Sequence, residues 1–179
     1  MYPYLKLAAV LLKARFQSKL EIDETSTHSY RAGVTDIDVF GELNNARQLV
    51  YFELGRWEYS QRVGFISQMR KRGWGLVVGG TSIRYRRRVP LFSKFDVTTR
   101  MLCHDSRWFY FLHEIHRNSE ICTSSLMKAG VTSKDGLVPA TEVTAVMGRP
   151  DWGPKIPAWV NAWIEAESER PWPASTKID

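Results

Sequence analysis

The residues whose types and spacing are best suited to chemistry lie between residues 35 and 56, in the stretch TDIDVFGELNNARQLVYFELGR. Asp36 and Asp38 are separated by one residue, and the polar pair Asn44 and Asn45 follows after a short loop. A carboxylate can activate water or attack a carbonyl carbon itself. Unpaired N–H groups at the N-terminus of a helix can stabilise the oxyanion that then develops. We therefore interpret the point where this loop enters a helix as a candidate active site.

The element that must position these groups is a helix, predicted from residue 46 to residue 63. Asn45 is placed to cap its N-terminus, Gln48 stands where a capping box requires it, and Gly64 is a typical C-terminal stop. Large side chains surround most of its circumference: Leu49, Val50, Tyr51, Phe52, Leu54, Trp57 and Tyr59. A helix of this kind is usually buried, so we expect the rest of the domain to enclose it.

A series of β-strands is predicted on both sides of this helix in the sequence. The strand segments are residues 28–35 before the helix and 73–89, 94–104, 108–116 and 120–133 after it. Gly79 and Gly80 predict a bulge in the first strand after the helix, and Pro90 ends that strand. A turn signal at residues 134–136 closes the series. The order predicts an α+β fold in which an antiparallel meander packs against one long helix.

The two ends of the chain differ from this central domain of residues 25–147. Residues 1–24 are predicted to contain a basic amphipathic helix. The apolar face of this helix consists of Leu5, Ala8, Ala9, Leu12 and Phe16. The helix packs on the domain or on a partner subunit, makes weak contact with a membrane surface, or acts as an inefficient signal sequence. Residues 148–179 form a tail rich in Pro, Gly and Trp, with a short helix at residues 157–168.

Composition and charge narrow the class of protein. The 179 residues are 44% hydrophobic and 12% aromatic, which is typical of one globular domain with a substantial core. The net charge of +6 suits a phosphorylated ligand, an anionic lipid or nucleic acid, but no known nucleic-acid-binding module accompanies it. Cys103 and Cys122 form no disulfide framework, and no His–Cys cluster has the spacing of a zinc site. We therefore expect a cytoplasmic protein with buried thiols, no metal and no nucleic acid partner.

The order of these motifs resembles one known family. The pattern D-x-D-x-x-G-x-x-N-N, then a helix with Y-x-E-x-x-R, then a meander, is similar to the 4-hydroxybenzoyl-CoA thioesterase-like branch of the hotdog-fold superfamily. The matching residues are Asp36, Asp38, Gly41, Asn44, Asn45, Tyr51, Glu53 and Arg56. The resemblance implies a hotdog fold, in which a curled antiparallel sheet wraps one long central helix. It also implies a homodimer or tetramer that hydrolyses acyl thioesters of coenzyme A or acyl carrier protein, without a cofactor, at the subunit interface.

The resemblance assigns roles to individual residues. Asp38 is the expected general base or nucleophile, and the N–H groups of Asn45 and Ala46 are expected to polarise the thioester carbonyl. Glu53 is a second candidate for the catalytic carboxylate, although it can also pair with Arg56 one helical turn later. The expected substrate-binding residues are Gly41, Glu42, Asn44, Ala46, Tyr51, Arg86 and Arg88. The two arginines belong to a basic run that is expected to contact the phosphates of coenzyme A.

One position departs from the family pattern. Many relatives have His directly after the Gly of the motif, whereas this chain has Glu42. A second carboxylate close to Asp38 would raise the pKa of one of the two. The alternative function is therefore a catalytically silent hotdog domain that binds acyl-CoA or a partner protein. A hotdog dehydratase has less support, because those enzymes use a His with a carboxylate and this motif contains no His.

Overall fold

The computed structural model describes residues 3–171. The strands are β1 (Ser26–Arg31), β2 (Gly75–Tyr85), β3 (Lys94–His104), β4 (Phe109–Arg117), β5 (Glu120–Ser133) and β6 (Gly136–Val138). The helices are α1 (Tyr4–Arg15), the 3-10 helix η1 (Val34–Asp36), α2 (Asn45–Arg62), α3 (Phe65–Arg72), α4 (Ala140–Val146) and α5 (Ala158–Glu169). Residues 172–179, the last part of the predicted Pro-, Gly- and Trp-rich tail, lie outside the described residues.

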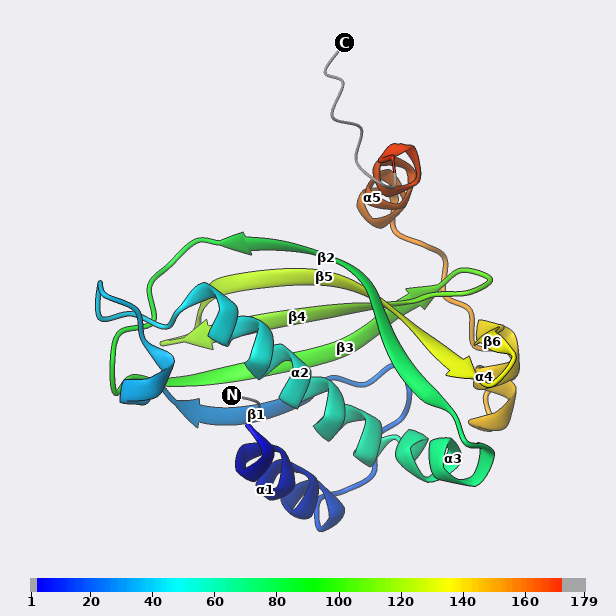
Figure 1. Ribbon diagram of the computed structural model, residues 1–179, viewed down its shortest axis with the longest axis horizontal. Helices are drawn as coiled ribbons and strands as arrows, with labels where there is room; N and C mark the ends of the chain where they lie inside the picture. Colours follow the sequence, from blue (N-terminus) through cyan, green and yellow to red (C-terminus); the bar gives the residue numbers. More distant parts are fainter. Residues whose placement is uncertain (1–2, 172–179) are drawn as a thin grey trace.

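The strands form one curled antiparallel sheet in the order β1-β3-β4-β5-β2, with β6 pairing to β5. The long helix α2 crosses one face of this sheet, and α1 lies beside α2 near β1 (Figure 1). The core between α2 and the sheet joins Tyr51, Phe52 and Leu54 of the helix to Phe95 and Ile115 of the strands, all of them buried. The predicted α+β arrangement of a meander against one long helix is therefore confirmed.

A glycine in α2 lets the helix approach the sheet closely. A Cβ atom added at Gly55 would lie 2.5 Å from Oγ1 of Thr99 on β3. Real Cβ atoms do not make contacts of that length, so any larger residue at this position would push the helix away from the strand. The close approach brings the neighbouring turn of α2 against β3 and β4, where Arg56 contacts His113 and His113 contacts Thr99.

Most of the predicted strands agree with the structure. The segments predicted at residues 94–104 and 120–133 coincide with β3 and β5. The bulge predicted at Gly79 and Gly80 is confirmed by a register shift between Val78 and Gly80, where β2 pairs with β5. The first strand is shorter than predicted, because the chain turns into η1 at residue 34.

The N-terminus of α2 differs from the prediction. The helix begins at Asn45 itself, and its N-cap is Asn44, whose side-chain oxygen accepts the N–H of Ala46 at 2.9 Å. Gln48 makes no capping box, because its side chain is buried and donates to the carbonyl of Leu43 while accepting from Thr123. Of two adjacent asparagines, the earlier one therefore has the extended backbone that a cap requires.

A second helix, α3, follows α2 directly and has the basic residues 70–72 in its last turn. Gly64, with a φ of +80°, ends α2 and starts this second helix without a long connection. Gly73, with a φ of +65°, then ends α3. A glycine in the left-handed conformation stops each helix in turn, and the prediction recognised only the first of these stops.

Helix α1 packs on the domain through a face other than the predicted one. Val10 and Ala14 are buried, and Leu7 packs against the main core. The predicted apolar face is instead largely exposed, with 88% of Leu5, 61% of Leu12 and 81% of Phe16 accessible. Helix α1 is thus apolar on two sides. Among residues 3–171, no helix is both long and apolar enough to cross a membrane.

Candidate functional site

The loop that carries Asp38 is a tight hairpin. Ile37 and Leu43 face each other across it, and the N–H of Asp38 donates to the carbonyl of Glu42 at 2.9 Å. Gly41 has a φ of +71°, a conformation that favours glycine, which explains its place in the motif. The loop is therefore a hydrogen-bonded turn that leads directly into the N-terminus of α2.

Only one of the two carboxylate oxygens of Asp38 accepts hydrogen bonds within this hairpin. Its Oδ1 accepts the N–H of Phe40 at 2.9 Å and that of Glu42 at 3.5 Å. Within residues 3–171, Oδ2 has no hydrogen-bond partner or ion pair, and the residue is partly exposed. One oxygen thus fixes the side chain while the other remains open to a bound molecule.

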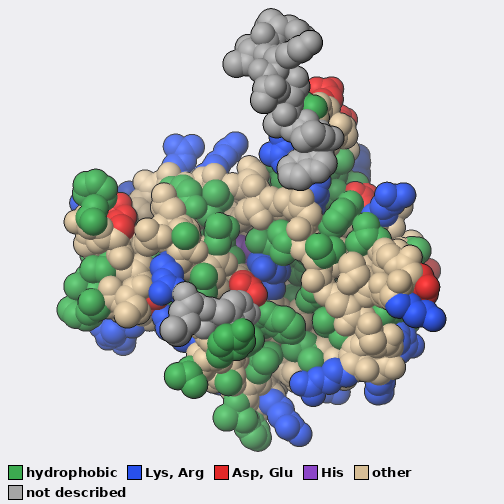
Figure 2. Space-filling model, viewed as in Figure 1, with side chains coloured by type: hydrophobic (Ala, Val, Ile, Leu, Met, Phe, Trp, Pro, Cys, Tyr) green, Lys and Arg blue, Asp and Glu red, His purple; other side chains and the backbone are tan. Residues whose placement is uncertain are grey.

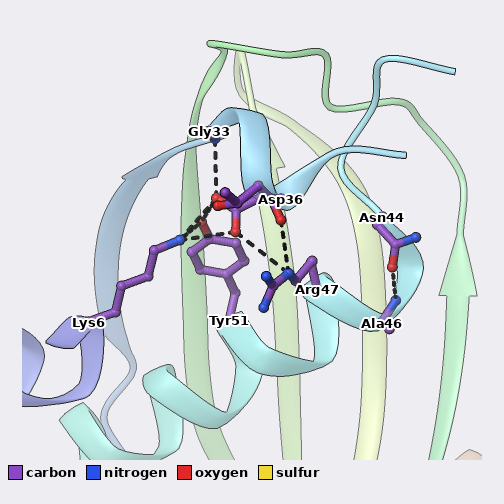
Figure 3. A network of polar contacts seen from close by, with 8 residues as sticks. Lys6, Gly33, Asp36, Asn44, Ala46, Arg47 and Tyr51 are labelled. Atoms are coloured by element: carbon purple, nitrogen blue, oxygen red, sulfur yellow. Dashed lines mark hydrogen bonds and ion pairs between the residues drawn. The ribbon is translucent and has the colours of Figure 1, made fainter. Parts of the chain in front are cut away.

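The carboxylate of the other aspartate of the motif, Asp36, is fully occupied by hydrogen-bond donors. The buried carboxylate of Asp36 accepts bonds from Nζ of Lys6 at 2.9 Å, from the hydroxyl of Tyr51 at 2.8 Å and from the N–H of Gly33 at 3.2 Å, and Nε of Arg47 lies 3.9 Å away (Figure 3). Burial alone would raise the pKa of Asp36, but these donors outweigh it and hold that pKa below its ordinary value. Asp36 therefore ties α1, η1 and α2 together as a charged anchor.

Tyr51 belongs to this anchor. Its hydroxyl points to Asp36, and burial together with the Asp36 carboxylate raises the pKa of Tyr51 far above its ordinary value. The phenol consequently stays protonated and donates. It was predicted to bind substrate, and the structure gives its hydroxyl a structural hydrogen bond instead of an open position.

The N-terminus of α2 offers one open donor. The N–H of Ala46 already donates to the cap on Asn44, so it is not free to polarise a carbonyl as predicted. No described residue accepts a hydrogen bond from the N–H of Asn45, which is the first residue of the helix. Asn45 is exposed, and the hydroxyl of Tyr85 on β2 reaches its carbonyl at 3.5 Å.

The basic run beside this end is partly neutralised. Arg88 pairs with Glu42 and also donates to the carbonyl of Phe40 at 2.9 Å, so Glu42 is directed to this arginine. Strand β2 stops at Tyr85, and the N–H groups of Arg86 and the next residue both donate to the carbonyl of Cys122, at 2.8 and 3.0 Å. The strand alternation expected through residue 88 is therefore interrupted, and Arg86 stays exposed.

A mostly apolar cavity of about 140 Å³ lies between the later turns of α2 and the sheet. Among its lining residues are Phe65, Leu76, Met101, Phe111, Val131 and Val143. Two charged side chains of α2, Glu53 and Arg56, also line it. In the face shown in Figure 2, acidic and basic side chains meet in a central hollow with hydrophobic groups around it. Asp38 is not among the lining residues.

A buried histidine on β4 supports Arg56. Nη1 of Arg56 lies 3.5 Å from Nε2 of His113, and Nδ1 of His113 lies 3.0 Å from Oγ1 of Thr99. Complete burial and the neighbouring Arg56 hold the pKa of His113 well below its ordinary value, so the ring is neutral. A guanidinium can only donate, so we assign Nε2 as the acceptor and Nδ1 as the donor to Thr99. Sequence patterns gave no signal for this contact, because it joins residues 57 positions apart.

The remaining groups limit the chemistry that the site can perform. No three His, Cys, Asp or Glu side chains among residues 3–171 are grouped so that they could hold a metal ion. Burial raises the pKa of the Cys103 thiol to about 11, and it also raises that of Cys122. Both cysteines therefore lack the thiolate character of a nucleophile, which leaves the carboxylates of Asp38 and Glu53 as the candidates.

Comparisons with known proteins agree with this architecture. The family model described as "Thioesterase-like superfamily" matches residues 32–164. The chain is 29% identical over 167 residues to Protein THEM6 of Xenopus laevis, covering 90% of this chain and 78% of that one.

Two solved structures have a similar fold. The probable thioesterase YbaW of Escherichia coli aligns with a TM-score of 0.64 at 18% identity, covering 69% of this chain and 96% of that one. The DHNA-CoA thioesterase of Staphylococcus aureus aligns with a TM-score of 0.60 at 17% identity, covering 87% of this chain and 99% of that one. The hotdog fold expected from the motif is thereby confirmed.

Proposed function

The chain belongs to the thioesterase-like superfamily, and from this premise we propose that it hydrolyses acyl thioesters of coenzyme A or acyl carrier protein. The observation that supports this best is that α2 carries two features: its N-terminus follows the loop with the open carboxylate oxygen of Asp38, and its later turns, with Glu53 and Arg56, line the apolar cavity. An acyl chain matches the cavity wall, whereas a carboxylate and a helix N-terminus match the thioester carbonyl. One structural neighbour acts on a CoA thioester according to its name, which favours CoA as the carrier.

In this proposal Asp38 is the general base or the nucleophile. Its Oδ2 is proposed to act on water or on the thioester carbonyl carbon, while Oδ1 is held by the N–H of Phe40. The N–H of Asn45 is the proposed oxyanion donor, and the partial positive charge of the helix end adds to it. Ala46 is no longer part of this role, because its N–H is taken by Asn44.

Glu53 is the competing carboxylate. It lies in the cavity wall one turn before Arg56, whose guanidinium is held by His113. If the carbonyl lies deeper in the cavity, Glu53 becomes the base and Arg56 stabilises the oxyanion. The two assignments differ in which substitution removes turnover, so they can be separated directly.

The phosphates of CoA are proposed to lie near the end of β2. Arg86 is exposed, and neither it nor Arg84 pairs with an acidic residue within the described part of the chain. Arg88 is also proposed to bind a phosphate of CoA, in place of its ion pair with Glu42. Its side chain is more than half exposed, so a phosphate can reach it. A salt-dependent KM for acyl-CoA is the expected consequence.

A homodimer is proposed to complete the site. Strand β2 is an edge strand of 11 residues that pairs only with β5 among the described strands, and most of its residues are exposed. An exposed edge of this length readily pairs with another strand. Leu76, Val77 and Val78 of this edge also line the cavity, so a partner at β2 would close it.

One observation favours the silent binding domain as a second candidate. Glu42 replaces the His of many relatives, and its side chain pairs with Arg88. A domain of this kind would bind acyl-CoA without releasing thiol.

The test is a free-thiol release assay with short, long and aromatic acyl-CoA thioesters. Wild type is compared with Asp38→Asn, with Glu53→Gln and with Asp135→Asn, a control in an exposed turn. We expect Asp38→Asn to lower kcat by at least about a hundredfold, with Asp135→Asn unchanged. Loss of turnover only in Glu53→Gln would identify Glu53, in the cavity wall, as the catalytic base. Full turnover in both Asp38→Asn and Glu53→Gln would rule out both carboxylates as the catalytic group.

A further inference from the structure

Helix α1 presents an unusual second apolar face to solvent. Leu5, Leu12 and Phe16 are 88%, 61% and 81% exposed, and the small residues Ala8 and Ala9 between them are exposed too. Their spacing places all five on one side of the helix. Hydrophobic side chains protrude at the lower end of the molecule in Figure 2, where Figure 1 places α1. We call these five residues the outer face of α1.

The helix behind this face is fastened to the domain. Val10 and Ala14 are buried on its inner side, and Nζ of Lys6 lies 2.9 Å from the buried carboxylate of Asp36. Contacts near both ends of the helix therefore hold it side-on against α2. A helix of 12 residues is about 18 Å long, too short to cross a bilayer core of about 30 Å. Held in this way, the outer face can lie flat on a surface.

Within residues 3–20, the charges beside the outer face have one sign. Lys13, Arg15 and Lys19 are exposed, and none of them pairs with an acidic side chain within the described residues. Residues 3–20 contain no Asp or Glu at all. Apolar side chains flanked by unpaired cations match a bilayer with anionic headgroups, where the apolar groups enter the interface and the cations meet phosphate and carboxylate.

A second copy of this chain fits the outer face less well. Two copies joined through it would bring the cations of both helices together without an acidic group in α1 to compensate. Helix α1 also lies near β1, at the opposite edge of the sheet from β2. A dimer through β2 would leave the outer face open.

We propose that the outer face of α1 docks this domain on an anionic lipid bilayer, with the helix lying in the plane of the interface. The inference is independent of the proposed catalytic function, because no residue of the outer face belongs to the candidate site. Binding requires both the apolar side chains and the neighbouring cations, so each can be removed separately.

The test is flotation of the full chain with vesicles of phosphatidylcholine, with and without phosphatidylserine, at low and high salt. The variant Leu5→Ser/Leu12→Ser/Phe16→Ser removes the large apolar side chains without changing charge. The matched control Ile121→Ser/Trp159→Ser replaces apolar residues that are 45% and 52% exposed on other elements. Circular dichroism and light scattering report the fold and the oligomeric state of every variant.

We expect wild type and the control to float with the anionic vesicles at low salt. The triple variant should bind on the order of a hundredfold more weakly. Lys13→Gln/Lys19→Gln should lose roughly fivefold per cation on anionic vesicles only. Equal binding by the folded triple variant, or no binding by wild type, overturns the proposal. A triple variant that turns a larger assembly into a smaller one assigns the outer face to a second copy and overturns it as well.

Discussion

The hydroxyl of Tyr51 lies 2.8 Å from Oδ2 of Asp36, although the two residues are 15 positions apart and belong to different elements. This bond, with the ion pair to Lys6, occupies the first aspartate of the D-x-D motif. The second, Asp38, keeps one oxygen open. Two residues of the same type, separated by a single position, thus have different tasks: one holds three elements together and the other faces outward.

The anchor role of Asp36 predicts a pH-dependent stability. Its pKa lies below the ordinary value of 3.8 in the folded protein, so its stabilisation is complete above that pH and disappears as the pH falls through the folded pKa. We expect Asp36→Asn to lower the free energy of unfolding by about 2 kcal/mol at neutral pH. Urea unfolding of the two proteins should show this gap closing in acid. The exposed Asp135→Asn serves as control, and a gap that persists at low pH contradicts the assignment.

His113 predicts a second pH effect at milder acidity. Burial and Arg56 lower its pKa well below 6.5, so below that pH the unfolded chain binds a proton that the folded chain excludes. Stability should therefore fall as the pH decreases from about 7.5 to about 5.5. His28, whose pKa is also lowered, adds to this slope. His113→Gln should give a flatter slope in urea unfolding, and an unchanged slope would show that His113 titrates normally.

Close packing at Gly55 predicts a steric penalty. Gly55→Ala places a methyl group against Oγ1 of Thr99, and we expect the free energy of unfolding to fall by about 1–3 kcal/mol. Helix propensity alone would change it by about 1 kcal/mol in the opposite direction, so the sign decides between the two effects. Thermal or urea unfolding measures it. In the double variant with Thr99→Ala, the penalty should be smaller than the sum of the two single changes.

The buried pair of Glu58 and Arg62 predicts an asymmetric mutational response. Oε1 of Glu58 accepts from Nη1 of Arg62 at 3.0 Å, and the Glu58 side chain is 1% exposed. Arg62→Met leaves a buried carboxylate without its partner and should destabilise by about 3 kcal/mol. Adding Glu58→Gln to that variant should recover part of the loss. Wild-type stability of Arg62→Met would show that the pair is unimportant, and equal stability of the single and double variants would contradict an unpaired carboxylate as the cause of the loss.

The fold was predictable because β3 alternates clearly, turn residues separate the later strands, and α2 is long with large side chains around most of its circumference. The motif from Asp36 to Arg56 predicted the family because it combines residue types and order. Sequence could not reveal that the N–H of Ala46 donates to the side chain of Asn44, because either asparagine is a suitable N-cap by residue type.

Long-range pairing was equally hidden in the sequence. Arg88 reaches Glu42 across 46 positions, and Lys6 reaches Asp36 across 30. Helix α1 was assigned the wrong packing face because both of its sides are apolar, and only tertiary contact decides between them. Contacts of this kind depend on the path of the whole chain and leave no local pattern.

The most direct measurement is the rate of thiol release by purified wild-type protein from a series of acyl-CoA thioesters, with acyl-CoA binding measured in parallel. We predict saturable turnover well above the buffer rate for at least one acyl group, and loss of this turnover in Asp38→Asn with acyl-CoA binding retained. Tight binding of acyl-CoA with no turnover on any thioester would contradict this prediction and identify the chain as a binding domain.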